Sequence, residues 1–245
     1  MTKLRAEPIY WIMVLASAVL YGVEFLIFGR AGEIGFSLLG NLAFLPVYVL
    51  FVTLMIEQIL KRRERESLRQ KLNMVVGVFF SEVGVPLLKC CREFVRESPE
   101  LTGMLKVSPQ WQAADYQRCL AYLEQHEIHV DSRNGDLVAL REFVVNRRTF
   151  MLGLLENQNL LEHDKFTDLL WAVFHLLEEL EARHSLDVLP PNDLDHISID
   201  IKRAYSNLLR VWVVYMQHLQ RDYPYLFSLA VRMNPMIPDA HAEFG

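Results

Sequence analysis

Four side chains in the second half of the chain are of types that bind transition metals: His175, Glu178, Glu181 and His184. Glu181 and His184 form a Glu-x-x-His pair, the spacing that di-iron carboxylate bundles use to direct two ligands at one metal ion. His175, Glu178 and Glu179 share one face of the same predicted helix. A metal site is therefore one interpretation of this segment.

That interpretation needs further ligands, because such bundles combine two Glu-x-x-His pairs with two more glutamates. The only similar pair is Asp193-x-x-His196, which follows the Pro190-Pro191 doublet at the start of another helix. We therefore favour a solvated polar helix face over a metal site. The cofactor, if there is one, stays unknown.

Glu24 lies inside an apolar segment, where an ionisable group is costly and suggests a function. If residues 9–29 and 36–58 form a hairpin, Glu24 lies opposite Asn41. The carboxyl and the amide could then form a hydrogen bond between two membrane helices. We favour this structural role over an ion or proton pathway.

Both of those segments are long enough to cross a hydrocarbon core of about 30 Å as helices. Residues 9–29 contain one ionisable residue and residues 36–58 contain only Glu57, close to the end. The sequence thus predicts an all-α protein with an N-terminal transmembrane hairpin followed by a helical bundle.

The flanking charges predict the orientation, because Lys and Arg near membrane spans stay in the cytoplasm. The second span is followed by KRRERESLRQK, which we interpret first as a plain stop-transfer signal. The alternative is that its first cations contact lipid headgroups: Lys61, Arg62, Arg63 and Arg65. We expect a multi-pass protein of the cell (inner) membrane, with the N-terminus and the C-terminal domain in the cytoplasm.

Residues 72–245 carry 16 Lys and Arg against 24 Asp and Glu, so nucleic acid is an unsuitable partner. Cys90 and Cys91 adjoin two cations, but we expect buried, inert thiols. No nucleotide-binding, serine-hydrolase or zinc-protease motif is present.

Apolar periodicity and turn residues divide this part into helices. The predicted segments are 72–88, about 108–125, 136–157, 163–184, 192–221 and 224–232. The expected organisation is a hairpin over 1–60, a basic juxtamembrane helix over 61–80, a cytoplasmic domain over 81–232 and a tail over 233–245.

The 192–221 helix has two apolar stripes, and only one is needed for a core. We expect the other to contribute to a subunit interface formed by Tyr205, Leu209, Trp212, Val213 and Met216.

Three functions fit these features. The preferred one is a non-enzymatic homo-oligomer in the lipid bilayer that serves as a scaffold, sensor or channel. The alternatives are a membrane-anchored metal-dependent enzyme that uses the His/Glu helix face, and a tether that binds another protein through the C-terminal region.

Overall fold

The computed structural model describes residues 15, 19, 22, 23, 26, 31–96, 99–157, 160, 164–237 and 240–242. The chain divides into two compact units, Met1–Glu66 and Ser67–Gly245. In the described residues every named element is helical, and the only pairing of extended segments is the single bridge between Val95 and Val130. The all-α prediction is confirmed.

Helix α2 covers Ala31–Phe79, a length of 49 residues, and contains the second predicted span and the basic segment. The helix is therefore continuous through the basic residues to Phe79. Most of the first predicted span, including Glu24, lies outside the described residues, and so does the predicted pair of Glu24 with Asn41.

By length and composition, one described helical stretch, Tyr48–Arg92, is apolar enough to cross a membrane. Of its apolar window, 44% is buried inside the protein, as in the core helix of a folded domain. The two ends of the stretch differ, because Phe79, Phe80 and Leu87 are buried whereas the side chains from Tyr48 to Leu60 are exposed.

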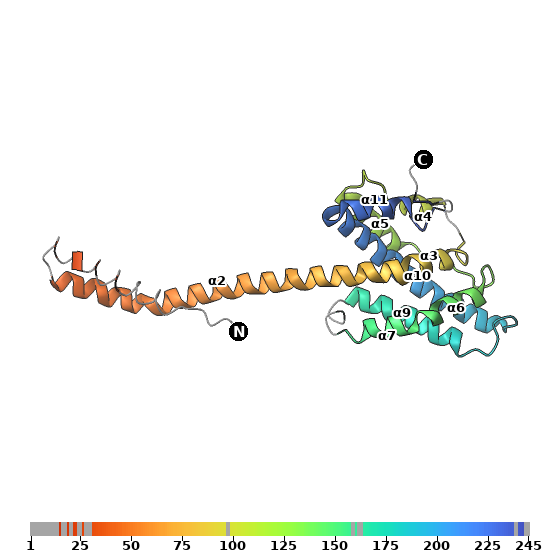
Figure 1. The fold of residues 1–245 in the computed structure, drawn as a ribbon, viewed down its shortest axis with the longest axis horizontal. Helices are drawn as coiled ribbons and strands as arrows, with labels where there is room; N and C mark the ends of the chain where they lie inside the picture. The colour runs from red at the N-terminus through yellow and green to blue at the C-terminus, as the bar shows by residue number, and fades with distance from the viewer. Residues whose placement is uncertain are drawn as a thin grey trace. The chain divides into compact units, whose positions relative to one another are not determined.

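The second unit is a bundle arranged around one long helix, α10. The end of α2 leads into a π-helical turn, η1, over Phe80–Gly84. The remaining helices are α3 Val85–Arg92, α4 Pro99–Met104, α5 Ala113–Gln125, α6 Leu137–Asn146, α7 Arg148–Leu155, α9 Asp164–Glu181, α10 Pro191–Asp222 and α11 Pro224–Arg232. Helix α10 packs against α9, α5, α11, α3 and η1 (Figure 1).

The bundle is larger than the predicted range 81–232. Val76, Phe79 and Phe80 belong to its core, so it begins within α2. At the other end Asn234 is buried, and its Nδ2 donates a hydrogen bond to the Leu105 carbonyl at 3.0 Å. The apolar side chains before residue 81 and the hydrogen-bonded Asn234 after residue 232 both belong to the bundle, and the predicted boundaries left both out.

Two predicted helices differ from those observed. Helix α5 begins at Ala113 rather than near residue 108, because Gln112 and Asp115 form a reciprocal capping box there. The helix predicted over 136–157 is two helices with a break at Arg147. The Nε of Arg147 donates a hydrogen bond to the Glu82 carbonyl, a contact that links the break to η1.

The predicted subunit interface requires correction. Its five residues are at most 1% exposed and lie in the core of the bundle: Tyr205, Leu209, Trp212, Val213 and Met216. Because α10 is covered on several sides, both of its apolar stripes pack within one chain, and no surplus face remains at these positions.

Candidate metal centre

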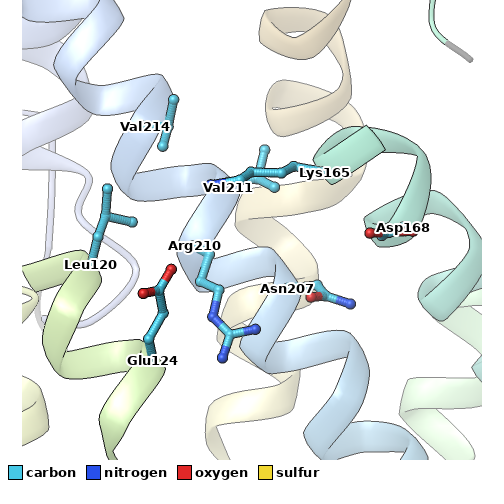
Figure 2. A pocket seen from close by; sticks show the side chains of 8 residues that line it. All are labelled: Leu120, Glu124, Lys165, Asp168, Asn207, Arg210, Val211 and Val214. Carbon is cyan, nitrogen blue, oxygen red and sulfur yellow. The ribbon is translucent and has the colours of Figure 1, made fainter. Parts of the chain in front are cut away.

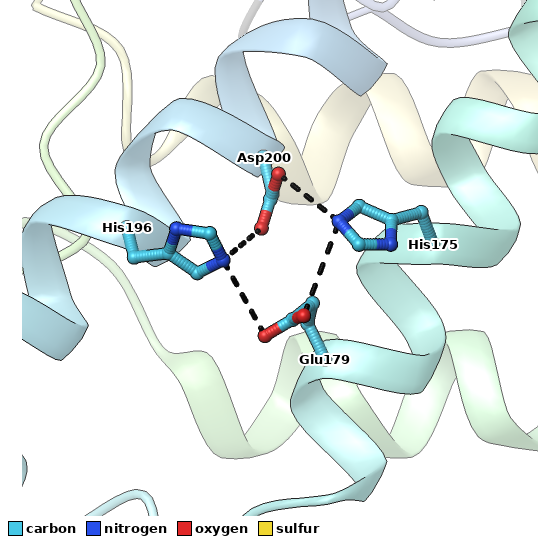
Figure 3. Close-up of side chains that lie close together, drawn as sticks. All are labelled: His175, Glu179, His196 and Asp200. Carbon is cyan, nitrogen blue, oxygen red and sulfur yellow. Dashed lines mark ion pairs between the residues drawn. The ribbon is translucent and has the colours of Figure 1, made fainter.

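Two histidines and two carboxylates converge between α9 and α10 (Figure 3). Helix α9 supplies His175 and Glu179, and α10 supplies His196 and Asp200. One nitrogen or oxygen atom from each residue lies within 4.8 Å of the other three. On each helix the two residues are four positions apart, which places them about 40° apart around the axis.

The contacts between these groups form a ring. The Nε2 of His175 lies 3.5 Å from Asp200 Oδ1 and 4.0 Å from Glu179 Oε1. The Nε2 of His196 lies 3.3 Å from Asp200 Oδ2 and 3.6 Å from Glu179 Oε2. Each histidine therefore faces both carboxylates, and each carboxylate divides its oxygens between the two imidazoles.

Asp200 is the deepest of the four residues, with 1% of its side chain exposed. Its Oδ1 accepts a hydrogen bond from Arg203 at 2.9 Å, but its buried Oδ2 has no hydrogen-bond partner. A buried carboxylate oxygen without a donor is costly. A cation between Oδ2 and the histidines would satisfy it.

Arginines hold both carboxylates in place. Arg203 binds Asp200, and Arg183 donates a hydrogen bond to Glu179 Oε2 at 2.9 Å. The hydrogen bond from Arg183 lowers the pKa of Glu179, so its carboxyl group stays ionised. Outer partners of this kind orient metal ligands in known metal sites.

The helices that carry the four residues are fixed by their apolar faces. Leu176, Leu177 and Leu180 of α9 are fully buried, as are Ile197 and Ile201 of α10. Each of the two pairs therefore lies at the edge of a buried stripe. The histidines are partly exposed at 43% and 51%, so the cluster is open to solvent on their side.

The donor set suits a divalent transition metal. Imidazole nitrogen and carboxylate oxygen together bind zinc, iron and manganese. Ligands about 2.1 Å from a tetrahedral ion are separated by roughly 3.4 Å. Three contacts around the ring, at 3.3, 3.5 and 3.6 Å, are close to this spacing, and the fourth, between His175 and Glu179, is longer at 4.0 Å.

Only one of the four predicted metal ligands, His175, belongs to the cluster. Glu181 instead forms an ion pair with Arg148, and both Glu178 and His184 are exposed. Glu181 lies about 120° around the helix from His175, so the two side chains do not point to the same place. The informative signal is His-x-x-x-Glu at 175–179 repeated as His-x-x-x-Asp at 196–200.

Burial raises the pKa of all three cysteine thiols, to about 11 for Cys119. Cys91 and Cys119 are buried, whereas Cys90, which was also predicted to be buried, is partly exposed. The basic residues predicted to contact lipid, Lys61, Arg62, Arg63 and Arg65, are exposed on α2. Their lipid contact stays a prediction.

The fold and the cluster define an all-helical protein in which side chains of metal-ligating types converge at a solvent-accessible position. Two family models match the chain: the C-terminal helical domain of uncharacterized protein MJ1433 over residues 68–232, and the N-terminal helical domain of MJ1433 over residues 7–60. The chain belongs to this family.

A relative from Methanocaldococcus jannaschii, described as uncharacterized protein MJ1433, is 42% identical over 223 residues. The alignment covers 91% of this chain and 90% of the relative. No solved structure matches the chain significantly.

Proposed function

We propose that the protein is a membrane-anchored, metal-dependent enzyme whose helical domain holds one divalent transition-metal ion. The proposed ligands are His175, Glu179, His196 and Asp200. The observation that carries this proposal is the convergence of four donor atoms within 4.8 Å around a buried carboxylate oxygen that has no hydrogen-bond partner.

An adjoining pocket favours a catalytic over a closed structural site. This pocket has a volume of about 370 Å³, and its lining includes His175, Trp171 and Arg203. Catalytic metal sites keep a coordination position open for water or substrate. A bound ion would polarise a small molecule in this pocket, which Arg203 lines while its Nη1 stays bound to Asp200.

Metal content tests the binding. Full-length protein purified in detergent should contain about one equivalent of zinc, iron or manganese by elemental analysis. The double variant His175→Ala/His196→Ala should contain less than about a tenth of that amount. His184→Ala is the matched control, because His184 is exposed on the segment that follows α9. Equal metal content in the double variant would refute the site.

Exogenous ligands test the open position. In cobalt-substituted protein, azide should change the visible spectrum, because it adds to an accessible coordination site. A spectrum that azide leaves unchanged at saturating concentration would indicate a closed structural centre and would contradict the proposed catalysis.

We further propose that the N-terminal segments form the expected transmembrane hairpin. Ten large apolar side chains of α2 are 44–67% exposed: Tyr48, Val49, Leu50, Phe51, Val52, Leu54, Met55, Ile56, Ile59 and Leu60. Burying each of them would contribute about 1.5 kcal/mol or more. A helix that is apolar all round is typical of a membrane span. The exposed cations that follow support a cytoplasmic helical domain.

Two measurements test this placement. The protein should stay in the membrane pellet after extraction with carbonate, and protease added outside the cell should leave residues 67–245 intact. Recovery of the protein in the supernatant would contradict the hairpin. Digestion of the helical domain by protease added outside would show the opposite orientation. The expected homo-oligomer, the channel and the C-terminal protein partner stay predictions.

A further inference from the structure

A second pocket, of about 290 Å³, lies between α5, α9 and α10 (Figure 2). Leu120, Val211 and Val214 form its apolar part, and Asn207 adds an amide. Its four charged side chains are Glu124, Lys165, Asp168 and Arg210. The volume is at the small end of the range for ligand sites, which suits a small metabolite.

The charges of this pocket balance, with two carboxylates and two cations. Among the described residues, none of the ion pairs joins two of these four side chains, although they line one space. Arg210 donates a hydrogen bond from Nη2 to the Leu123 carbonyl at 3.1 Å, which holds its side chain, and its buried Nε has no partner. No carboxylate oxygen of the pocket thus lies within 4.0 Å of a nitrogen of its two cations, and Glu124, Lys165 and Asp168 are exposed to solvent.

This charge pattern selects against ions of one sign. A simple anion would meet Glu124 and Asp168, and a simple cation would meet Lys165 and Arg210. A ligand that carries both an ammonium and a carboxylate group can pair with both kinds of side chain at once. The valines and Leu120 would accommodate an aliphatic group.

We propose that this pocket binds a small aliphatic zwitterion of the amino-acid or dipeptide class. The carboxylates Glu124 and Asp168 receive its ammonium group, and Lys165 and Arg210 receive its carboxylate. The pocket shares Asp168 and Asn207 with the pocket beside His175, so one end of a longer ligand would extend toward the proposed metal centre. Binding in the pocket itself does not require the metal ion.

Calorimetric titration of the full-length, metal-free protein tests the proposal with L-leucine and leucyl-leucine as probes. At least one of them should bind. N-acetylation removes the ammonium charge of the probe, and C-terminal amidation removes its carboxylate charge. Each modification should weaken binding of that probe by about tenfold or more. Failure of both probes to bind, or equal affinity for the modified forms, would overturn the proposal.

Variants assign the two halves of the pocket. Asp168→Asn should weaken the unmodified probe by about tenfold but leave the affinity of its N-acetylated form unchanged. Lys165→Gln should weaken binding of the unmodified probe by about tenfold but leave the affinity of its C-amidated form unchanged. Glu178→Gln and Arg118→Gln alter exposed residues of α9 and α5 and serve as matched controls. An equal effect of Asp168→Asn on both forms would exclude a contact with the ammonium group.

The metal measurements are independent of this titration. If the metal site fails and the zwitterion still binds, only the proposed enzyme is refuted. If metal binds and both probes fail, only this ligand class is refuted.

Discussion

His196 and Asp200 lie one helical turn apart on α10, with Nε2 of the histidine 3.3 Å from Oδ2 of the aspartate. The same oxygen is buried and accepts no hydrogen bond. The pair therefore brings an imidazole nitrogen close to a carboxylate oxygen that lacks a donor. His175 and Glu179 of α9 approach the same two groups.

Adjacent glutamates on α9 should differ sharply in metal affinity. Glu179→Gln removes a proposed ligand and should weaken zinc binding by at least about tenfold. Glu178→Gln changes an exposed neighbour and should leave the affinity unchanged. Competition with a chromophoric chelator measures both values. Equal affinities for the two variants would exclude Glu179 from the coordination sphere.

Bound metal should stabilise the fold. A ligand whose free concentration is about 100 times its dissociation constant adds about 2.7 kcal/mol to the free energy of unfolding. For a domain of this size that corresponds to a rise in Tm of roughly 5–10 °C. Differential scanning fluorimetry should show the rise with zinc, its reversal by EDTA and its loss in His196→Ala. A similar rise in that variant would place the bound zinc elsewhere.

His218 should make the metal-free protein less stable as the pH falls below about 6.5. Burial lowers the pKa of His218 and outweighs the opposing effect of Asp222, 2.7 Å away. The folded state thus favours the neutral imidazole. The protein keeps its full stability above the pKa that His218 has in the unfolded chain, because the imidazole is then neutral in both states. Protonation at lower pH favours the unfolded chain.

Urea unfolding at pH 7 and pH 5 measures this contribution. His218→Gln should lose less stability between the two pH values than the wild-type protein does. His184→Gln, at an exposed position, should follow the wild type. If His218→Gln also follows the wild type, His218 does not control the pH dependence.

Two glycines should respond oppositely to alanine. At Gly84 an added Cβ would overlap the ring of Phe80, so Gly84→Ala should cost about 1–3 kcal/mol of stability. At Gly153 of α7 an added Cβ would meet no atom within 4 Å apart from its own stretch of helix. Gly153→Ala should therefore raise the free energy of unfolding by about 0.5–1 kcal/mol, because alanine favours the helix. Thermal unfolding measures both. Destabilisation by Gly153→Ala would contradict the open surroundings of that residue.

Periodicity predicted the helices because a buried stripe repeats within one segment. The stripe of α9, which includes Phe166, Leu170 and Leu177, placed that helix within a few residues of Asp164–Glu181. The break at Arg147 could not be predicted this way. It is linked to Glu82, 65 positions earlier, through a tertiary hydrogen bond.

The cluster of His175, Glu179, His196 and Asp200 was only partly predictable for the same reason. Spacing within α9 identified His175, but the partners of a ligand depend on which faces of two helices meet. The choice of Glu179 over Glu181 follows from the packing of α9 against α10. The predicted interface failed because the sequence shows that a face is apolar but not what covers it.

X-ray absorption at the metal edge of the full-length purified protein identifies the ligands of the proposed ion. We expect a first shell of nitrogen and oxygen donors at about 2.0–2.2 Å, with outer-shell scattering from two imidazole rings. His175→Ala/His196→Ala protein reconstituted with the same metal should lose that imidazole scattering. A wild-type spectrum without imidazole scattering, or one identical to that of the double variant, would contradict the proposed metal centre.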